Sequence, residues 1–235
     1  MSRSLKGFVA LAFVLAGLFA ALGFWQVARL GQRRARNAQV LARLRDPVTP
    51  VERLADTLSY HRAIASGTAD YANEIVLTGR SRDGSPGVYL LTPLRPVHGD
   101  TASLVIRGWV YSPDAATIDV SRWRERRDTF AGYVARIPDG PVTRAGERPR
   151  SIRRLTMSAA RELLPYPVAR MYLISQDAAA DTAPARLPPP ALDEGSHLNY
   201  AITWFSFAAI AVIGAATIVA QARLSPEGTR QAQLD

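Results

Sequence analysis

The chain has 235 residues, no cysteine and a formal net charge of +9, which comes almost entirely from arginine. The lack of cysteine excludes disulfide bonds, thiolate metal sites, a catalytic cysteine, a lipoprotein anchor and covalent c-type haem attachment. A basic balance is typical of proteins that contact nucleic acid or anionic lipid. Because the chain has a long apolar stretch near each end, we expect membrane lipids or an acidic ligand as partners, and no nucleic acid.

The first apolar stretch, residues 7–28, predicts a transmembrane helix. It carries no charge from Gly7 to Trp25, and about 20 helical residues cross the roughly 30 Å hydrocarbon layer of a bilayer. Arg3 and Lys6 precede the stretch, so a cleaved signal peptide is the alternative interpretation. The apolar run is longer than the usual core of about 7–15 residues in a signal peptide, and no A-x-A site ends it, which favours an uncleaved anchor.

The first helix is expected to continue into water over residues 26–45. Arginines recur there at helical spacing, at Arg29, Arg33, Arg36 and Arg43. Most of them are interpreted as a basic collar at the level of the lipid headgroups.

A shorter helix is expected from residue 49 to about residue 59. Pro47 ends the preceding helix, because the residue before a proline disfavours the α region. Thr49 is a suitable cap, Pro50 suits the first helical position and Glu52 can reach back in a capping box.

The central part, residues 29–176, predicts an extracytoplasmic domain that is mostly antiparallel β with short helices. The β-rich runs are residues 63–71, 74–78, 88–92, 102–111, 130–137 and 169–175. Residues 79–87 and 97–100 contain turn-forming glycines and are expected to be hairpin loops. Residues 158–164 predict a short helix.

The C-terminal part predicts a linker, a second span and a tail. Residues 177–196 are rich in alanine and proline, which favours an extended spacer. Residues 197–222 predict the second transmembrane helix, and residues 223–235 a cytoplasmic tail. The expected fold class is therefore membrane α+β, with two transmembrane helices that flank one β domain.

The arginines around the two spans give opposed indications of orientation. Arg223 and Arg230 follow the second span, whereas more arginines follow the first span than precede it. We favour a multi-pass protein of a bacterial inner membrane, with both termini cytoplasmic and the main domain periplasmic. In either orientation, the end of the first span and the start of the second lie at the same membrane face.

The first motif that carries chemistry lies at the end of the first span. Trp25 and Arg29 are four residues apart and face the same way on a helix, with Gln26 between them. The ordinary interpretation is an interfacial tryptophan followed by an arginine that reaches the headgroups. The functional interpretation is a platform for a flat anionic ligand, in which the indole stacks and the guanidinium pairs with a carboxylate.

The second motif is Arg107-Gly108-Trp109, within the expected strand 102–111. Glycine inside a strand often indicates a bulge or a close approach of another backbone. The ordinary interpretation is a bulged strand whose tryptophan fills the core.

The third motif lies at the start of the second span. His197, Tyr200 and Trp204 share one helical face. An imidazole beside aromatic rings is a candidate axial ligand for haem iron, and the alternative is an interfacial histidine in an aromatic belt. His61 and His98 are isolated and lack metal-binding spacing, and no hydrolase or nucleotide-binding fingerprint is present.

These motifs, in this order and between two apolar spans, resemble the surfeit locus protein 1 family of cytochrome c oxidase assembly factors. The pieces that carry the resemblance are Gly23 to Arg29 (GFWQVAR), Thr92-Pro93-Leu94, Arg107 to Val110 (RGWV) and His197 to Phe205 (HLNYAITWF).

The resemblance implies an assembly factor, not an enzyme, that binds haem a and assists its insertion into the oxidase catalytic subunit. It implies His197 as the ligand of the haem iron, aromatic side chains against the ring and arginines on the propionates. Other assembly factors are further expected partners. The expected cofactor-binding residues are His197, Tyr200, Trp204, Trp25, Gln26, Arg29, Arg107 and Trp109.

Two alternatives stay open. In one, the protein is a scaffold that binds oxidase subunits without haem, and the three motifs are docking surfaces. In the other, it is a membrane-anchored enzyme or sensor that uses the β domain, where His61, His98 and Asp100 are the residues to test.

Overall fold

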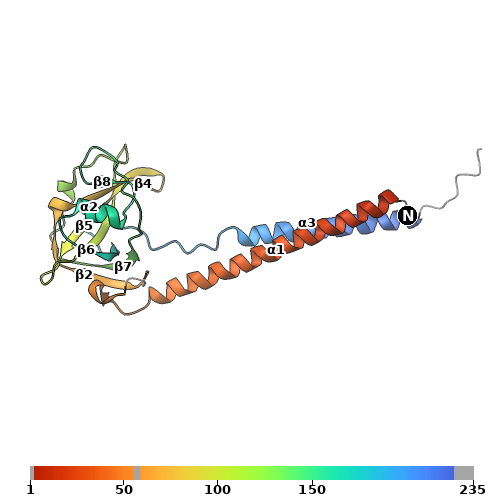
Figure 1. Ribbon diagram of the computed structural model, residues 1–235, viewed down its shortest axis with the longest axis horizontal. Helices are drawn as coiled ribbons and strands as arrows, with labels where there is room; N and C mark the ends of the chain where they lie inside the picture. Colours follow the sequence, from red (N-terminus) through yellow and green to blue (C-terminus); the bar gives the residue numbers. More distant parts are fainter. Residues whose placement is uncertain (1–2, 56–58, 225–235) are drawn as a thin grey trace, which may run out of the picture. The chain divides into compact units, whose positions relative to one another are not determined.

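The structure is a computed structural model, and it describes residues 3–55 and 59–224 (Figure 1). These residues form two units, each compact in itself. The helical unit contains the chain up to residue 38 and from residue 192 onward, and the sheet unit contains residues 39–191.

The helical unit is built from α3 (His197–Leu224) and from α1 (Arg3–Arg43) as far as residue 38, and the end of α1 belongs to the sheet unit. By length and composition, each of these two helices could cross a membrane. Helix α1 continues without a break past the apolar stretch, which confirms the predicted extension, and it ends two residues earlier than expected. Its 41 residues span about 60 Å, roughly twice the thickness of a hydrocarbon layer.

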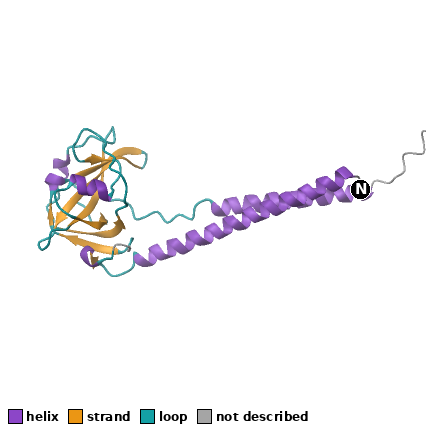
Figure 2. Ribbon diagram, in the orientation of Figure 1, coloured by secondary structure: helices purple, strands orange, loops and turns teal. Residues whose placement is uncertain are grey.

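The two long helices run antiparallel and side by side in this unit (Figures 1 and 2). Phe19 stacks on Trp204 with a centroid distance of 5.8 Å, and Gln26 contacts His197 further along. The helices approach closely at Gly23, where an added Cβ would lie 2.6 Å from the ring of Phe205. Small residues at the contact allow the close packing on which helix association in membranes depends.

The sheet unit is a mixed sheet of β1 (Thr49–Pro50), β2 (Arg62–Ser66), β3 (Thr68–Ala69), β4 (Ile75–Arg82), β5 (Ser85–Arg95), β6 (Ala102–Tyr111), β7 (Thr129–Arg136), β8 (Ser151–Ile152) and β9 (Val168–Ser175). Within the described residues, the strand order is β1-β2-β7-β9-β6-β5-β4-β8, and β3 pairs with β5.

The expectation of a mostly antiparallel sheet needs one correction. The pairs β2/β7, β7/β9, β5/β6, β4/β5 and β3/β5 are antiparallel, but β6/β9, β1/β2 and β4/β8 are parallel. Strand β9 follows a long connection that contains β8 and α2 (Met157–Leu163), and it enters between β6 and β7. The connection from β6 to β9, which contains β7, β8 and α2, is long enough for these two strands to pair in parallel, which a tight hairpin does not allow.

One face of the sheet is covered by α2. The buried residues Met157, Ala160 and Leu163 of this helix belong to the same apolar cluster as Leu104 and Ile174 of the strands. The Thr156 side chain accepts a hydrogen bond from the Ala159 amide and so caps the helix at its start. The predicted helix 158–164 is therefore present, shifted by one residue.

The hairpin expected at residues 79–87 is present, but its loop is shorter than expected. Strand β4 runs on to Arg82 and β5 begins at Ser85. Only Asp83 and Gly84 turn, and both have positive φ, 50° and 79°. An Asp-Gly pair suits a two-residue hairpin turn that needs positive φ at both positions, so the glycine at 84 and not the whole glycine-rich run marks the turn. The turn expected at residues 97–100 is confirmed between β5 and β6.

The helix expected over residues 49–59 is wrong in its described part. Thr49 and Pro50 form β1, Val51–Arg53 is a single 3₁₀ turn, and Leu54 is extended. The Thr49 hydroxyl donates to the Pro47 carbonyl and does not cap. Pairing with β2 therefore outweighs the local capping preference. Residues 56–58 of this prediction lie outside the described residues.

Candidate functional site

The contact that defines the candidate site lies between the two long helices. The carboxamide oxygen of Gln26 lies 2.8 Å from Nδ1 of His197, across 171 positions of sequence. A hydrogen bond at this distance requires the proton on Nδ1, and in neutral imidazole this leaves Nε2 with a free lone pair. No described residue forms a hydrogen bond with Nε2 of His197.

Trp25 and Arg29 form the face that the sequence predicts. The Arg29 guanidinium carbon lies 5.5 Å from the centroid of the Trp25 ring, a cation–π geometry. Arg29 also donates to the Gln32 side chain. Trp25 is 51% exposed and Tyr200 is 53% exposed. Two large rings near the Gln26–His197 contact are therefore open to a ligand, a lipid or a partner.

Trp204 occupies a different level from the one expected. It stacks on Phe19 and lies edge-on to Phe207, at centroid distances of 5.8 and 6.0 Å. Phe19 is nearly two helical turns from Gln26 along α1. Trp204 thus belongs to the packing between the helices, away from the level of Trp25, and it is only partly exposed.

Beyond this contact, α1 is fastened to the chain that leads into α3. Arg33 pairs with Asp193 at 2.6 Å and Arg34 with Glu194 at 2.8 Å. Asn37 donates to the carbonyl of Asp193 at 3.0 Å. Arg33, one of the arginines that the sequence pattern places in the basic collar, and its neighbour Arg34 are therefore exposed but paired with the returning chain.

Arg107 is not free to bind a ligand carboxylate in this structure. Its side chain is 0% exposed and pairs with Glu74 at 2.5 Å and with Glu125 at 3.0 Å. It also donates to Thr92 and to the Trp123 carbonyl, and its guanidinium lies over the Tyr71 ring. The expected role on a haem propionate is therefore replaced by a structural one inside the sheet unit.

The Arg107 group continues into a partly buried ion-pair network that no sequence motif indicates. Arg186 pairs with Glu125 at 2.7 Å and with Asp177 at 3.3 Å, and it donates to the Arg107 carbonyl. Arg127 also pairs with Asp177. The network holds three arginines and three carboxylates, so its charges balance. Its members are scattered over more than 100 positions, and no spacing in the sequence reveals them.

The bulge predicted in the second motif is confirmed. Gly108 lies opposite Leu90, but Ile106 lies opposite Leu91, so Arg107 is the extra residue. Gly108 has φ of 159°, and an added Cβ would clash with the carbonyl of Ala185. The backbones of Trp109 and Ala185 exchange two hydrogen bonds at 2.8 and 2.9 Å. The glycine therefore permits the close approach of the segment before α3.

Residues 177–196, which the sequence predicts to form an extended spacer, are partly attached to the sheet. Its first part is fastened to β6 through Ala185 and Arg186. Trp109 itself is half-buried and lies beside Tyr111, so it does not fill the core. Both Arg107 and Trp109 belong to the sheet unit, whereas the other expected site residues belong to the helical unit.

The remaining histidines take no part in a metal cluster. Nδ1 of His61 lies 3.0 Å from a carboxylate oxygen of Asp46, and His98 is exposed in the β5–β6 turn. In the part of the chain that the structure describes, no group of three or more His, Asp or Glu side chains could hold a metal ion.

A comparison of the chain with known protein families gives a match that covers most of the chain. Residues 13–209 match the SURF1 family. The chain belongs to the SURF1 family. This match includes all of the Gly23–Arg29, Arg107–Val110 and His197–Phe205 pieces, so it confirms the resemblance.

Relatives cover most of the chain. A SURF1-like protein of Rickettsia felis is 28% identical over an alignment of 204 residues, and the match covers 80% of this chain and 85% of the relative. SURF1-like proteins of Rickettsia conorii and Rickettsia bellii are 27% and 28% identical over 209 residues, and these matches cover 85% and 82% of the relatives. The similarity therefore extends over both units, and not only over the apolar spans.

Proposed function

We propose that this SURF1-family protein is an assembly factor for a haem–copper cytochrome c oxidase, which holds haem a and assists its insertion into the catalytic subunit. The family resemblance supports the role in oxidase assembly. The contact between Gln26 and His197 supports the haem site. No catalytic turnover is needed for this role.

The residues of the helical unit suit haem. The hydrogen bond to Gln26 selects the tautomer of His197 whose Nε2 can donate a lone pair to iron. Partners of this kind orient a metal-binding histidine and raise its basicity. Haem supplies the iron, an apolar ring and two carboxylates.

The side chains around His197 offer matching chemistry. Trp25 and Tyr200 present half-exposed rings for the macrocycle, and Arg29 presents an exposed guanidinium for a propionate. Trp204 would support the site by packing on Phe19. Arg107 has no free charge for a propionate, because it is buried with its own carboxylates.

For the location, we propose a bacterial inner membrane with both ends of the chain cytoplasmic and the sheet unit periplasmic. The antiparallel helices and Arg223 in the last turn of α3 support this orientation. Oxidase subunits, other assembly factors and membrane lipids are the proposed partners.

The test is an optical spectrum of the full chain, purified in detergent from cells that synthesise haem a. We expect a Soret band in the parent and its loss in His197→Ala. Gln26→Ala should keep a weaker band, with haem affinity reduced about 10- to 100-fold, because the imidazole loses its orienting partner. Asn199→Ala, an exposed neighbour on the same helix, is the matched control and should keep the parent spectrum.

A colourless parent from cells proven to make haem a would contradict the haem site. Oxidase assembly that is intact in His197→Ala would point to the same conclusion. The protein would then be a scaffold that binds oxidase subunits, and the motifs of the helical unit would be docking surfaces.

A further inference from the structure

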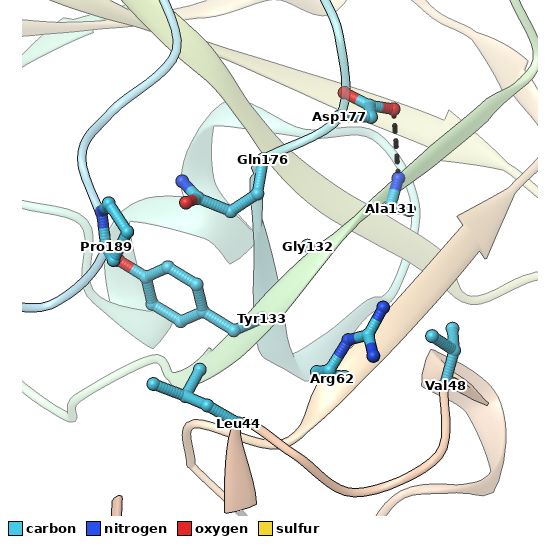
Figure 3. A pocket seen from close by; sticks show the side chains of 9 residues that line it. All are labelled: Leu44, Val48, Arg62, Ala131, Gly132, Tyr133, Gln176, Asp177 and Pro189. Carbon is cyan, nitrogen blue, oxygen red and sulfur yellow. Dashed lines mark hydrogen bonds between the residues drawn. The ribbon is translucent and has the colours of Figure 1, made fainter. Parts of the chain in front are cut away.

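A pocket of about 350 Å³ lies on the sheet unit, and none of its lining residues belongs to the proposed haem site (Figure 3). Its floor is β7 at Ala131 and Gly132. Its apolar walls include Leu44, Val48 and the ring of Tyr133. A volume near the lower end of ligand pockets, with walls that are mainly apolar, is typical of a site for a small molecule.

Arg62 provides a positive charge that no described carboxylate of the sheet unit pairs with. It lines the pocket from β2, its side chain is exposed, and it forms no ion pair with any residue that the structure describes. Asp177 also lines the pocket, but its carboxylate accepts from the Ala131 amide and pairs with Arg127 and Arg186. The negative charge is thus already compensated, and the pocket presents a net positive charge.

The remaining polar groups of the pocket are neutral and held in place. The Gln176 side chain donates to the Leu187 carbonyl at 2.6 Å. Burial raises the pKa of Tyr133 to about 12, so its phenol stays protonated at neutral pH. A ligand would therefore meet one cation at Arg62 and an otherwise uncharged, largely apolar lining.

The lining comes from segments that lie far apart along the chain. Leu44 and Val48 follow α1 directly, Arg62 and Tyr133 lie on adjacent strands, and Pro189 belongs to the segment that leads into α3. Both connections to the apolar helices thus contribute a wall. Only the folded sheet unit assembles these groups, which explains why the sequence pattern does not indicate them.

We propose that this pocket binds a small amphiphile that has an apolar chain and one carboxylate or phosphate head. The head pairs with the Arg62 guanidinium, which suits oxyanions of both kinds. The chain lies against Leu44, Val48 and Tyr133. This site is independent of the proposed haem site, because none of its residues belongs to the helical unit.

The test uses the absence of cysteine from the chain. Val48→Cys introduces a single thiol into the pocket wall, in the full chain embedded in nanodiscs of phosphatidylcholine. We expect octanoate and octyl phosphate to slow maleimide labelling of this thiol at least about tenfold, whereas octanol, with the same chain and no charge, should not. Arg62→Gln in the same background should weaken the octanoate effect about tenfold or more, since a hydrogen bond to a charged group is lost.

Two controls accompany this test. Val97→Cys lies on the exposed β5–β6 turn, where the valine is 84% exposed, and octanoate should leave its labelling unchanged. Arg161→Gln removes an exposed arginine from α2 and should leave the octanoate effect unchanged. Equilibrium dialysis of the unaltered chain with radiolabelled octanoate checks binding without any substitution.

The lipid composition separates the two sources of such a ligand. If phosphatidylglycerol in the nanodisc slows labelling of Val48→Cys by itself, the ligand is a bilayer lipid; if only the octyl compounds do so, it is a free amphiphile. Equal protection by octanol, or protection that survives Arg62→Gln, would overturn the proposal. The labelling of Val48→Cys does not depend on haem content. A negative result would therefore contradict the amphiphile site without contradicting the proposed haem site.

Discussion

At the scale of single residues, the arginine of the first motif and the arginine of the second motif have opposite environments. Arg29 lies exposed on a helix, over the face of Trp25. Arg107 is fully buried, with two carboxylates and a hydroxyl around its guanidinium. A buried charge is tolerated only with partners of this kind. Burial therefore decides that one arginine is available to a ligand and the other is part of the core.

This contrast predicts that Arg107→Gln destabilises the sheet unit by about 3–5 kcal/mol, because it leaves Glu74 as an uncompensated buried charge, whereas Glu125 keeps its ion pair with Arg186. Denaturant unfolding, followed by near-ultraviolet circular dichroism, measures the loss. Arg124→Gln is the control, since Arg124 is an exposed arginine whose guanidinium also lies over the Tyr71 ring. Unchanged stability together with reduced haem content would instead assign Arg107 to the ligand.

At the scale of elements, the packing of α1 on α3 determines whether His197 meets Gln26. Gly23 lies against the Phe205 ring, and Phe24 contacts the same ring edge-on at a centroid distance of 5.2 Å. A side chain at position 23 would separate the helices at this point. The glycine of the first motif is therefore a packing residue for the site, although it offers no chemistry of its own.

We accordingly expect Gly23→Leu to reduce cross-linking of the helices several-fold, because the new side chain meets the Phe205 ring. The measurement is the yield of a bismaleimide cross-link between Phe19→Cys and Phe207→Cys, whose parent rings lie 5.7 Å apart. Gly17→Leu is the matched control, since an added Cβ at Gly17 meets nothing within 4 Å. Equal cross-linking yields in the two leucine variants would contradict this packing role of Gly23. Adding Phe205→Ala to Gly23→Leu should restore the yield, because it removes the ring that the leucine meets.

At the scale of the whole molecule, two apolar helices enclose one sheet unit in the sequence. Because α1 and α3 are antiparallel, the start of α1 and the end of α3 lie at the same end of the helical unit (Figure 1). If both helices cross a bilayer, both ends of the chain are on one side and the sheet unit is on the other. Any ligand or oxidase subunit that meets the sheet unit then comes from that second side.

The proposed orientation predicts the labelling of single thiols in intact cells. A membrane-impermeant maleimide should label Asp139→Cys, in an exposed loop of the sheet unit, after permeabilisation of the outer membrane alone. Leu224→Cys, at the end of α3 where the leucine is 81% exposed, should react only after the inner membrane is opened. The reverse pattern would place the sheet unit in the cytoplasm and overturn the proposed location.

The sequence by itself determined the features that depend on local pattern. These are the two long apolar helices, the strand at residues 102–111 with its bulge, the short helix under the sheet and the family. Each follows from hydrophobic periodicity, from glycine or from a run of motif residues, and such signals need no information about distant parts of the chain.

Only the tertiary structure decided which residues meet. It brought Gln26 to His197 and buried Arg107 with Glu74 and Glu125. It also inserted β9 beside β6 and assembled the pocket around Arg62. The physical reason is that burial, ion pairing and strand partnership depend on neighbours that are distant in sequence. The sequence alone does not indicate whether an arginine side chain will lie in water, against an aromatic ring or between two carboxylates.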